Sequence, residues 1–299
     1  MKEDKRQVVL NMTRAGHNEK VIQKNVKQTQ IIAVTSGKGG VGKSTISVNM
    51  ALSLQELNKK VLLIDADIHL GNVDLILGLR PQYTMEDVMV NDTPLHEIIL
   101  HGPRRLDILP ASSASMDIIE TEDLFLRKLS QAFAGFAFNY DYIIIDTGAG
   151  IARNVLAFLL GADKIVVVLT PDPASITDAY AVIKVVRSVN KDIPVFMVAN
   201  MVNSADEGEI LFKKMNLMVQ KFLNGRIILG GSILKDDMVT RSVKTQQPFV
   251  LAYPNGSASN AIKILNRRVL HGHSIQNPKG NNLFDRLRNN KKIQFEWNL

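Results

Sequence analysis

The chain has 299 residues, with 36 Lys or Arg, 29 Asp or Glu and no cysteine. A chain of that length can form one large α/β domain or two small domains, and it can bury a large core. The lack of cysteine excludes a disulfide scaffold, a cysteine zinc site, an iron–sulfur cluster and a thiol nucleophile. Residues 1–29 carry a charge of +4 and residues 262–299 carry +6, so the total of +7 leaves −3 on residues 30–261. No apolar run approaches the roughly 20 residues that span a bilayer, and no apolar stretch follows Met1–Lys5 as a secretory signal requires. We therefore expect a soluble, cytoplasmic protein.

Residues 1–29 show no sustained period, which predicts a basic N-terminal extension. From residue 30 onward, short apolar runs alternate with amphipathic stretches, a pattern typical of a parallel sheet with helices on both faces. The predicted strands are Ile31–Thr35, Val61–Ala66, Leu106–Pro110, Tyr142–Asp146, Ile165–Thr170, Val195–Asn200 and Ile227–Ile233. The predicted helices are Ser44–Leu57, Thr121–Phe138, Ser175–Asn190, Ala205–Leu223 and Ser257–Leu270. We expect one doubly wound α/β domain over residues 30–270, a flexible connector over 271–282 and a basic amphipathic tail over 283–299.

Between the first predicted strand and helix lies a complete G-x-x-x-x-G-K-[ST] motif. Its glycines allow successive backbone N–H groups to converge on an anion, and the helix N-terminus adds its dipole. Lys43 should reach the terminal phosphates of a nucleotide, and the Ser44 hydroxyl should bind Mg²⁺. The alternative is a glycine-rich turn without a ligand, which a complete and correctly placed motif disfavours. The predicted binding residues are Gly37, Lys38, Gly39, Gly40, Val41, Gly42, Lys43, Ser44 and Thr45.

Two aspartate clusters lie at the carboxyl ends of predicted strands, where a doubly wound sheet binds its ligand. The first reads Asp65-Ala-Asp67, and the second reads Asp146-Thr-Gly-Ala-Gly150. Asp146 ends four apolar residues, as does the carboxylate that fixes a Mg²⁺-bound water in nucleotide hydrolases. The glycines after it fit a loop that senses the terminal phosphate. Each aspartate could instead cap a helix or turn, but the phosphate motif in the same sheet favours functional roles.

Lys38 is a second lysine in the loop, where Lys43 already serves the phosphates of its own chain. The pattern K-G-G-V-G-K-S resembles the deviant Walker A signature of ParA/MinD-type P-loop ATPases, and the similarity covers about residues 30–268. The resemblance implies that Lys38 reaches the phosphates of a partner in an ATP-bound, face-to-face homodimer, as an arginine finger does. It further implies that Asp67 orients the attacking water and that the Asn200 amide recognises adenine. ATP and Mg²⁺ are the implied cofactors, and the implied metal-site residues are Ser44, Asp67 and Asp146.

Several stretches look closer to flagellar number regulators of the FlhG/FleN (YlxH) group than to MinD proteins of the division site. They are Asp65–Leu79, Asp146–Ile151, Thr170–Tyr180 and Gln247–Pro254. This resemblance implies a slow ATPase that restricts flagellar number and placement together with an FlhF-type GTPase or basal-body components. Residues 4–10 depart from the D-Q-A-x-x-L-R segment with which that group usually begins.

The basic tail holds Leu283, Phe284 and Leu287 on one face of a possible helix, beside Arg and Lys side chains. This pattern suits an anionic membrane surface, so we expect reversible association with the inner face of the cell membrane. A solvated tail is the alternative. Two other functions stay open, namely a transcription antiactivator that binds a flagellar regulator and a ParA-type DNA-partitioning ATPase. The charge of −3 on residues 30–261 disfavours nucleic acid as the partner.

Overall fold

The structure is a computed structural model that describes residues 29–67, 71–91, 93–111 and 139–272. The predicted helix Thr121–Phe138, almost all of the N-terminal extension and the connector and tail beyond residue 272 lie outside the described residues. Within them, no helix combines the length and the apolar character needed to cross a bilayer.

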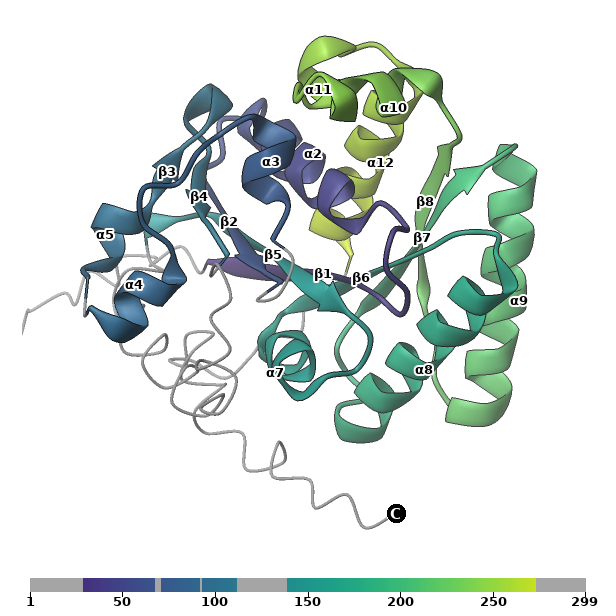
Figure 1. Ribbon diagram of the computed structural model, residues 1–299. Helices are drawn as coiled ribbons and strands as arrows, with labels where there is room; N and C mark the ends of the chain where they lie inside the picture. The colour runs from purple at the N-terminus through teal and green to yellow at the C-terminus, as the bar shows by residue number, and fades with distance from the viewer. Residues whose placement is uncertain (1–28, 68–70, 92, 112–138, 273–299) are drawn as a thin grey trace, which may run out of the picture.

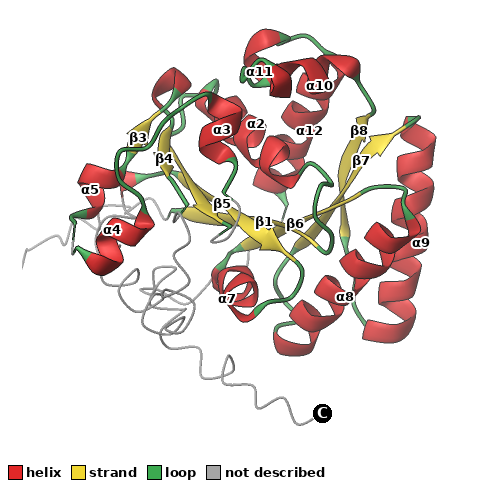
Figure 2. Cartoon of the chain, in the orientation of Figure 1, coloured by secondary structure: helices red, strands yellow, loops and turns green. Residues whose placement is uncertain are grey.

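The strands of the described residues form one eight-stranded sheet in the order β3-β4-β2-β5-β1-β6-β7-β8 (Figure 2). Neighbouring strands are parallel except for β3 and β4, which pair antiparallel at one edge. The expectation of an α/β fold with a mainly parallel sheet is therefore confirmed. The strands are β1 (Gln30–Ser36), β2 (Val61–Ala66), β3 (Leu100–His101), β4 (Asp107–Leu109), β5 (Tyr142–Ala149), β6 (Lys164–Leu169), β7 (Val195–Val202) and β8 (Ile228–Leu234).

Helices cover both faces of the sheet (Figure 1). On one face lie α2 (Lys43–Gln55), α3 (Val73–Leu77), α10 (Asp237–Lys244), α11 (Phe249–Ala252) and α12 (Ser257–His271). On the other lie α4 (Met85–Val90), α5 (Leu95–Ile98), α7 (Arg153–Gly161), α8 (Pro173–Val189) and α9 (Ala205–Leu223). A short 3₁₀ turn, η1 (Pro103–Arg105), precedes β4.

Strand β1 illustrates why the apolar runs are continuous. Ile31 and Ala33 pack in the core beneath the sheet, whereas Ile32 and Val34 pack in the core above it. Successive side chains of a strand point to opposite faces, so a strand covered on both faces must be apolar throughout.

Helix α2 follows the phosphate motif and is buried along most of its length. Two polar contacts tie it to the helices above it. The backbone N–H of Val250 in α11 donates to Asn49 Oδ1 at 2.9 Å, and the Asn266 amide of α12 donates to the Met50 carbonyl at 3.1 Å. These bonds fix α11 and α12 relative to the helix that carries the motif.

Where a predicted element lies within the described residues, it differs from the observed one mainly at its ends. β5 continues three residues beyond the predicted Asp146, to Ala149. α12 ends at His271, one residue beyond the predicted Leu270. The helices of nine residues or fewer were not predicted, because so few turns do not establish a period. They are α3, α4, α5, α7, α10 and α11, and the two-residue edge strand β3 was not predicted either.

Candidate functional site

A cavity of about 670 Å³ lies at the carboxyl ends of the central strands, the position where doubly wound sheets bind ligands. Its volume is within the range of small-molecule sites, about 300–1,000 Å³. The phosphate motif forms its floor, and α3 and α10 flank it. The residues that line it are Ser36, Gly39, Gly40, Gly42, Lys43, Ser44, Thr45, Asp67, Asn72, Leu75, Ile76, Ala149, Met201, Val243, Lys244 and Gln246.

The motif forms an open loop between β1 and α2. Gly40 has φ 75° and Gly42 has φ 88°, conformations that side chains of L-residues rarely adopt. A Cβ at Gly40 would meet no atom within 4 Å, so the backbone there faces open space. A Cβ at Gly42 would lie 2.4 Å from Asn200 Nδ2, so only glycine fits beside that amide. The loop thus needs glycine at position 42, and its backbone at Gly40 is open to the cavity that it lines.

Asn200 lies at this loop, brought there by β7. Its side-chain amide is buried and donates to the Val41 carbonyl at 2.8 Å. This contact joins residues 159 positions apart in the chain, and local sequence reasoning had no signal for it. Adenine recognition by Asn200 stays a prediction, and the observed role of its amide is to hold the loop.

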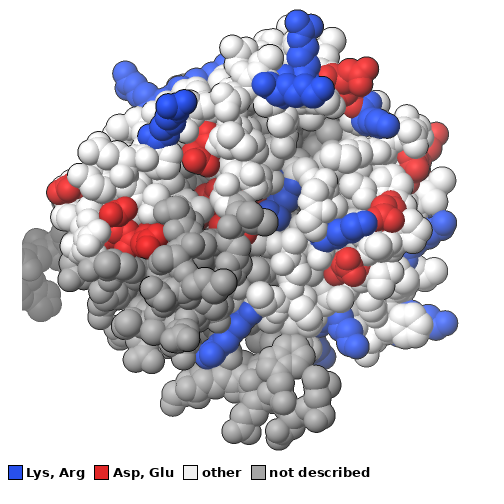
Figure 3. All heavy atoms as spheres, in the orientation of Figure 1, with Lys and Arg blue, Asp and Glu red and all other residues white. Residues whose placement is uncertain are grey.

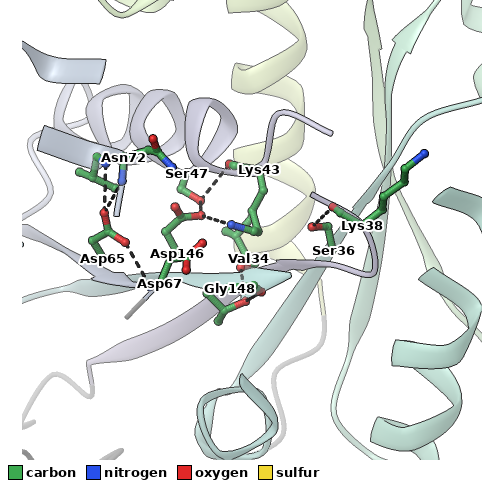
Figure 4. Close-up of polar contacts among 12 residues, drawn as sticks. Val34, Ser36, Lys38, Lys43, Ser47, Asp65, Asp67, Asn72, Asp146 and Gly148 are labelled. Carbon is green, nitrogen blue, oxygen red and sulfur yellow. Dashed lines mark hydrogen bonds and ion pairs between the residues drawn. The ribbon is translucent and has the colours of Figure 1, made fainter. Parts of the chain in front are cut away.

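Behind the loop, Lys43 and Asp146 form a buried pair (Figure 4). Lys43 Nζ lies 3.6 Å from Asp146 Oδ1, and the Ser47 hydroxyl donates to the same oxygen at 2.8 Å. Burial raises the pKa of Asp146, although the charge of Lys43 opposes that rise. Asp146 Oδ2 is also buried and makes no hydrogen bond with any described residue. An unpaired buried carboxylate oxygen costs free energy, and it is an oxygen to which a metal-bound water can donate.

Asp65 begins the first aspartate cluster of the sequence analysis, which gave it no site role of its own, and it organises the segment that carries Asp67. Its carboxylate accepts the backbone N–H groups of Asp67 at 3.2 Å, Asn72 at 2.9 Å and Val73 at 3.0 Å. Burial and the nearby charge of Asp146 raise its pKa to about 7. The first aspartate of the D-x-D pattern therefore holds the backbone, while the second, Asp67, lines the cavity. The sequence feature that could have indicated this role is the position of Asp65 inside an otherwise apolar strand, where a carboxylate needs hydrogen-bond partners.

Lys38 lies outside the cavity and points away from Lys43 (Figure 4). Its ammonium forms a hydrogen bond and ion pair with Asp172, the N-cap residue of α8, and both side chains are nearly half exposed. The bond to Asp172 raises the pKa of Lys38 and lowers that of Asp172. The two lysines of the loop are thus separated, with one inside the cavity and one at the surface.

Comparison with known proteins agrees with this geometry. Residues 29–197 match a family described as an AAA domain. The antiactivator FleN of Pseudomonas aeruginosa is 38% identical over 251 residues, which span 84% of this chain and 90% of FleN. The chain belongs to the ParA/MinD family of P-loop ATPases. The flagellum site-determining protein YlxH of Helicobacter pylori is 36% identical, over 82% of this chain and 83% of YlxH.

A solved structure of the family shows the same fold. The septum site-determining protein MinD of Pyrococcus horikoshii, complexed with Mg-ADP, has a TM-score of 0.67 and 25% identity, over 81% of this chain and 96% of that one. The resemblance to the ParA/MinD family and to its FleN/YlxH group is therefore confirmed. The sequence matches to FleN and YlxH cover most of this chain.

Proposed function

We propose that this protein is an ATP-hydrolysing dimerisation switch that regulates flagellar number and placement. ATP and Mg²⁺ favour a homodimer, slow hydrolysis dissolves it, and the dimer binds membrane and flagellar partners better than the monomer does. The observation that supports this proposal is the separation of the two lysines. Lys43 lines the cavity beside Asp146, whereas the Lys38 side chain is nearly half exposed at the surface, where a second molecule could contact it.

The residues of the cavity suit a triphosphate with Mg²⁺. The backbone of Gly39 and Gly40 would bind the phosphate oxygens, and Lys43 would hold the terminal phosphates. Ser44 and Asp67 line the same cavity, and Asp146 Oδ2 would accept a hydrogen bond from a metal-bound water. When bound, Mg²⁺ would neutralise charge on the phosphates. Asp67 would orient the water that attacks the terminal phosphate.

Lys38 would move between two anionic partners. In the structure it pairs with Asp172 of its own chain. In the ATP-bound dimer it would contact the phosphates of the other subunit, where its charge stabilises the transition state. Because the pair with Asp172 is exposed, it is weak, so a triphosphate competes with it easily.

The test is the oligomeric state and the ATPase rate, measured by size-exclusion chromatography with light scattering and by phosphate release. The wild-type chain should dimerise with Mg-ATP and not with Mg-ADP. Lys38→Ala should keep ATP binding nearly intact but lose dimerisation and hydrolysis, while Asp67→Ala should remain dimeric with ATP. A Lys38→Ala variant with full ATPase activity would overturn the proposal.

Membrane association is tested separately, on anionic liposomes. We expect the full chain to sediment with them in ATP more than in ADP, and a chain that ends at Gly272 to stay in the supernatant. This outcome would assign the tail 283–299 as a reversible anchor at the inner face of the cell membrane. Equal sedimentation of both chains would show that residues 283–299 are not needed for membrane binding.

An antiactivator function is a second candidate, because FleN of Pseudomonas aeruginosa is named an antiactivator and is 38% identical to this chain. In that case the chain would sequester a flagellar transcription activator. A pull-down of such an activator by wild type and by Lys43→Ala separates the two proposals. Equal recovery would favour sequestration without a nucleotide cycle, and loss in the variant would favour the switch.

A further inference from the structure

The cavity extends beyond the phosphate loop, to the end of α10. Val243, Lys244 and Gln246 line it opposite the loop residues. Figure 3 shows Lys and Arg atoms at the top of this face, over α10 and α11. Val243 and Lys244 end α10 and Gln246 follows it, so none of the three belongs to the nucleotide-binding motif, and the motif does not explain their position.

Helix α10 is held firmly against the rest of the site. Its end meets the end of α3, where a Cβ on Gly78 would lie 3.4 Å from Gln246 Cβ. α10 packs on α11, and α11 is bonded to α2 through Asn49. A residue at the end of α10 therefore has a fixed position relative to the phosphate loop, as a binding residue requires.

Charge singles out Lys244 among these residues. Among the described residues that line the cavity, the cations are Lys43 and Lys244, and the sole carboxylate is that of Asp67. Lys244 is exposed, and its ammonium makes no hydrogen bond or ion pair with any residue that the structure describes. By contrast, Lys43 is already close to Asp146.

We propose that Lys244 is a second cationic contact for the phosphate chain of the bound nucleotide, provided by α10 from across the cavity. This inference rests on the proposed ATP-binding function and adds a residue outside the phosphate loop. The apolar side chains of Leu75, Ile76 and Val243 line the same space. A ligand there would displace water from the contact between Lys244 and a phosphate, which strengthens the attraction between them.

A competing explanation is that Lys244 only complements the dipole of α10, because it is in the last turn of the helix. Arg241 provides the matched control. It is also a cation in the last turn of α10, it is exposed, and it does not line the cavity. A dipole role predicts similar effects from both residues, whereas a binding role predicts an effect from Lys244 alone.

The experiment is calorimetric titration of the full chain with Mg-ADP, which avoids hydrolysis. Lys244→Ala should raise the dissociation constant about tenfold, the size of one charged hydrogen bond, and Lys244→Arg should recover most of the affinity. Arg241→Ala should stay within about twofold of wild type. Added NaCl should weaken binding less in Lys244→Ala than in wild type, because one ionic contact is gone.

Equal dissociation constants for Lys244→Ala and wild type, alongside lost binding in Lys43→Ala, would overturn this inference and leave the ATP site intact. Equal losses in Lys244→Ala and Arg241→Ala would also overturn it, in favour of the dipole. A wild-type chain that binds no nucleotide would overturn the proposed function itself. Thermal melts of each nucleotide-free variant would verify that the fold is kept.

Discussion

Neutralising Asp146 should stabilise the nucleotide-free protein while it removes the activity. Asp146 is fully buried, its Oδ1 accepts a hydrogen bond from Ser47 at 2.8 Å, and its Oδ2 has no hydrogen bond to any described residue. A buried polar atom without a partner costs about 1–3 kcal/mol. The pKa of Asp146 is raised even with Lys43 at 3.6 Å, so the fold favours the neutral form despite that cation. Asp146→Asn keeps an oxygen for Ser47 and removes the disfavoured charge, but its amide N–H groups would have no acceptor at the place of Oδ2. It should therefore raise the free energy of unfolding by about 1 kcal/mol, less than the full cost of one unpaired polar atom.

The assay is thermal unfolding in EDTA without nucleotide, followed by the same scan with Mg-ATP. At about 2–4 °C per kcal/mol, Asp146→Asn should melt a few degrees above wild type in EDTA. Ser47→Ala is the control of opposite sign, because it removes the hydrogen bond to Asp146 and should lower the melting temperature. With Mg-ATP the wild type should gain more stability than Asp146→Asn, whose ATPase rate should fall about 100-fold or more. A variant that melts below wild type in EDTA would refute this reasoning.

Three further predictions concern the packing around the site. Gly42→Ala should weaken nucleotide binding and destabilise the fold by about 1–3 kcal/mol, because its Cβ would meet Asn200 Nδ2 at 2.4 Å with φ at 88°. Calorimetry would measure the loss of binding, and urea unfolding would measure the loss of stability. Gly39→Ala is the control and should keep the fold, because its Cβ would meet no atom within 4 Å. Lys164→Met should lower the free energy of unfolding, measured in urea, by about 2–4 kcal/mol. The buried Lys164 ammonium donates to the Val269 carbonyl oxygen at 2.6 Å and lies 3.4 Å from the Leu270 carbonyl oxygen. An unchanged urea midpoint would contradict this prediction. Asp65 has a pKa raised from 3.8 to about 7, so the metal-free protein should lose stability as pH rises from about 4 to 7. The loss should shrink in Asp146→Asn, and a wild-type stability that rises over this range would count against the raised pKa.

The sequence predicted well the parts of the fold that carry local signals. Helix α9 was predicted at both observed ends, because Ser204 caps its start and Asn224 adopts the left-handed conformation just after its end. The ends of β2 also agree with the prediction, since the strand lies between the charged residues Lys60 and Asp67. The phosphate loop was recognisable for the same reason, as its whole motif is contiguous.

Contacts between distant parts of the chain could not be predicted. The bond between Asn200 and Val41 and the pair of Lys38 with Asp172 join residues more than 130 positions apart. Lys164 looks like an ordinary surface lysine in the sequence, yet the end of α12 buries it completely. The cavity wall at α10 depends on how that helix meets α3, which no local pattern encodes.

The most direct test of the central claim is a mixing experiment with two inactive variants. Lys38→Ala lacks the lysine proposed to act on the other subunit, and Asp67→Ala lacks the carboxylate that acts in its own. In a mixed dimer, the site of the Lys38→Ala subunit would have its own Asp67 and the partner's lysine. Lys38→Ala does not pair with itself, so its route into a dimer is the lysine of an Asp67→Ala subunit. Each mixed dimer would have one complete site, so an equal mixture should regain an ATPase rate that neither variant shows alone, about a quarter of the wild-type rate where half of the dimers are mixed. A mixture as inactive as its components would contradict the claim that Lys38 completes the site of a second molecule.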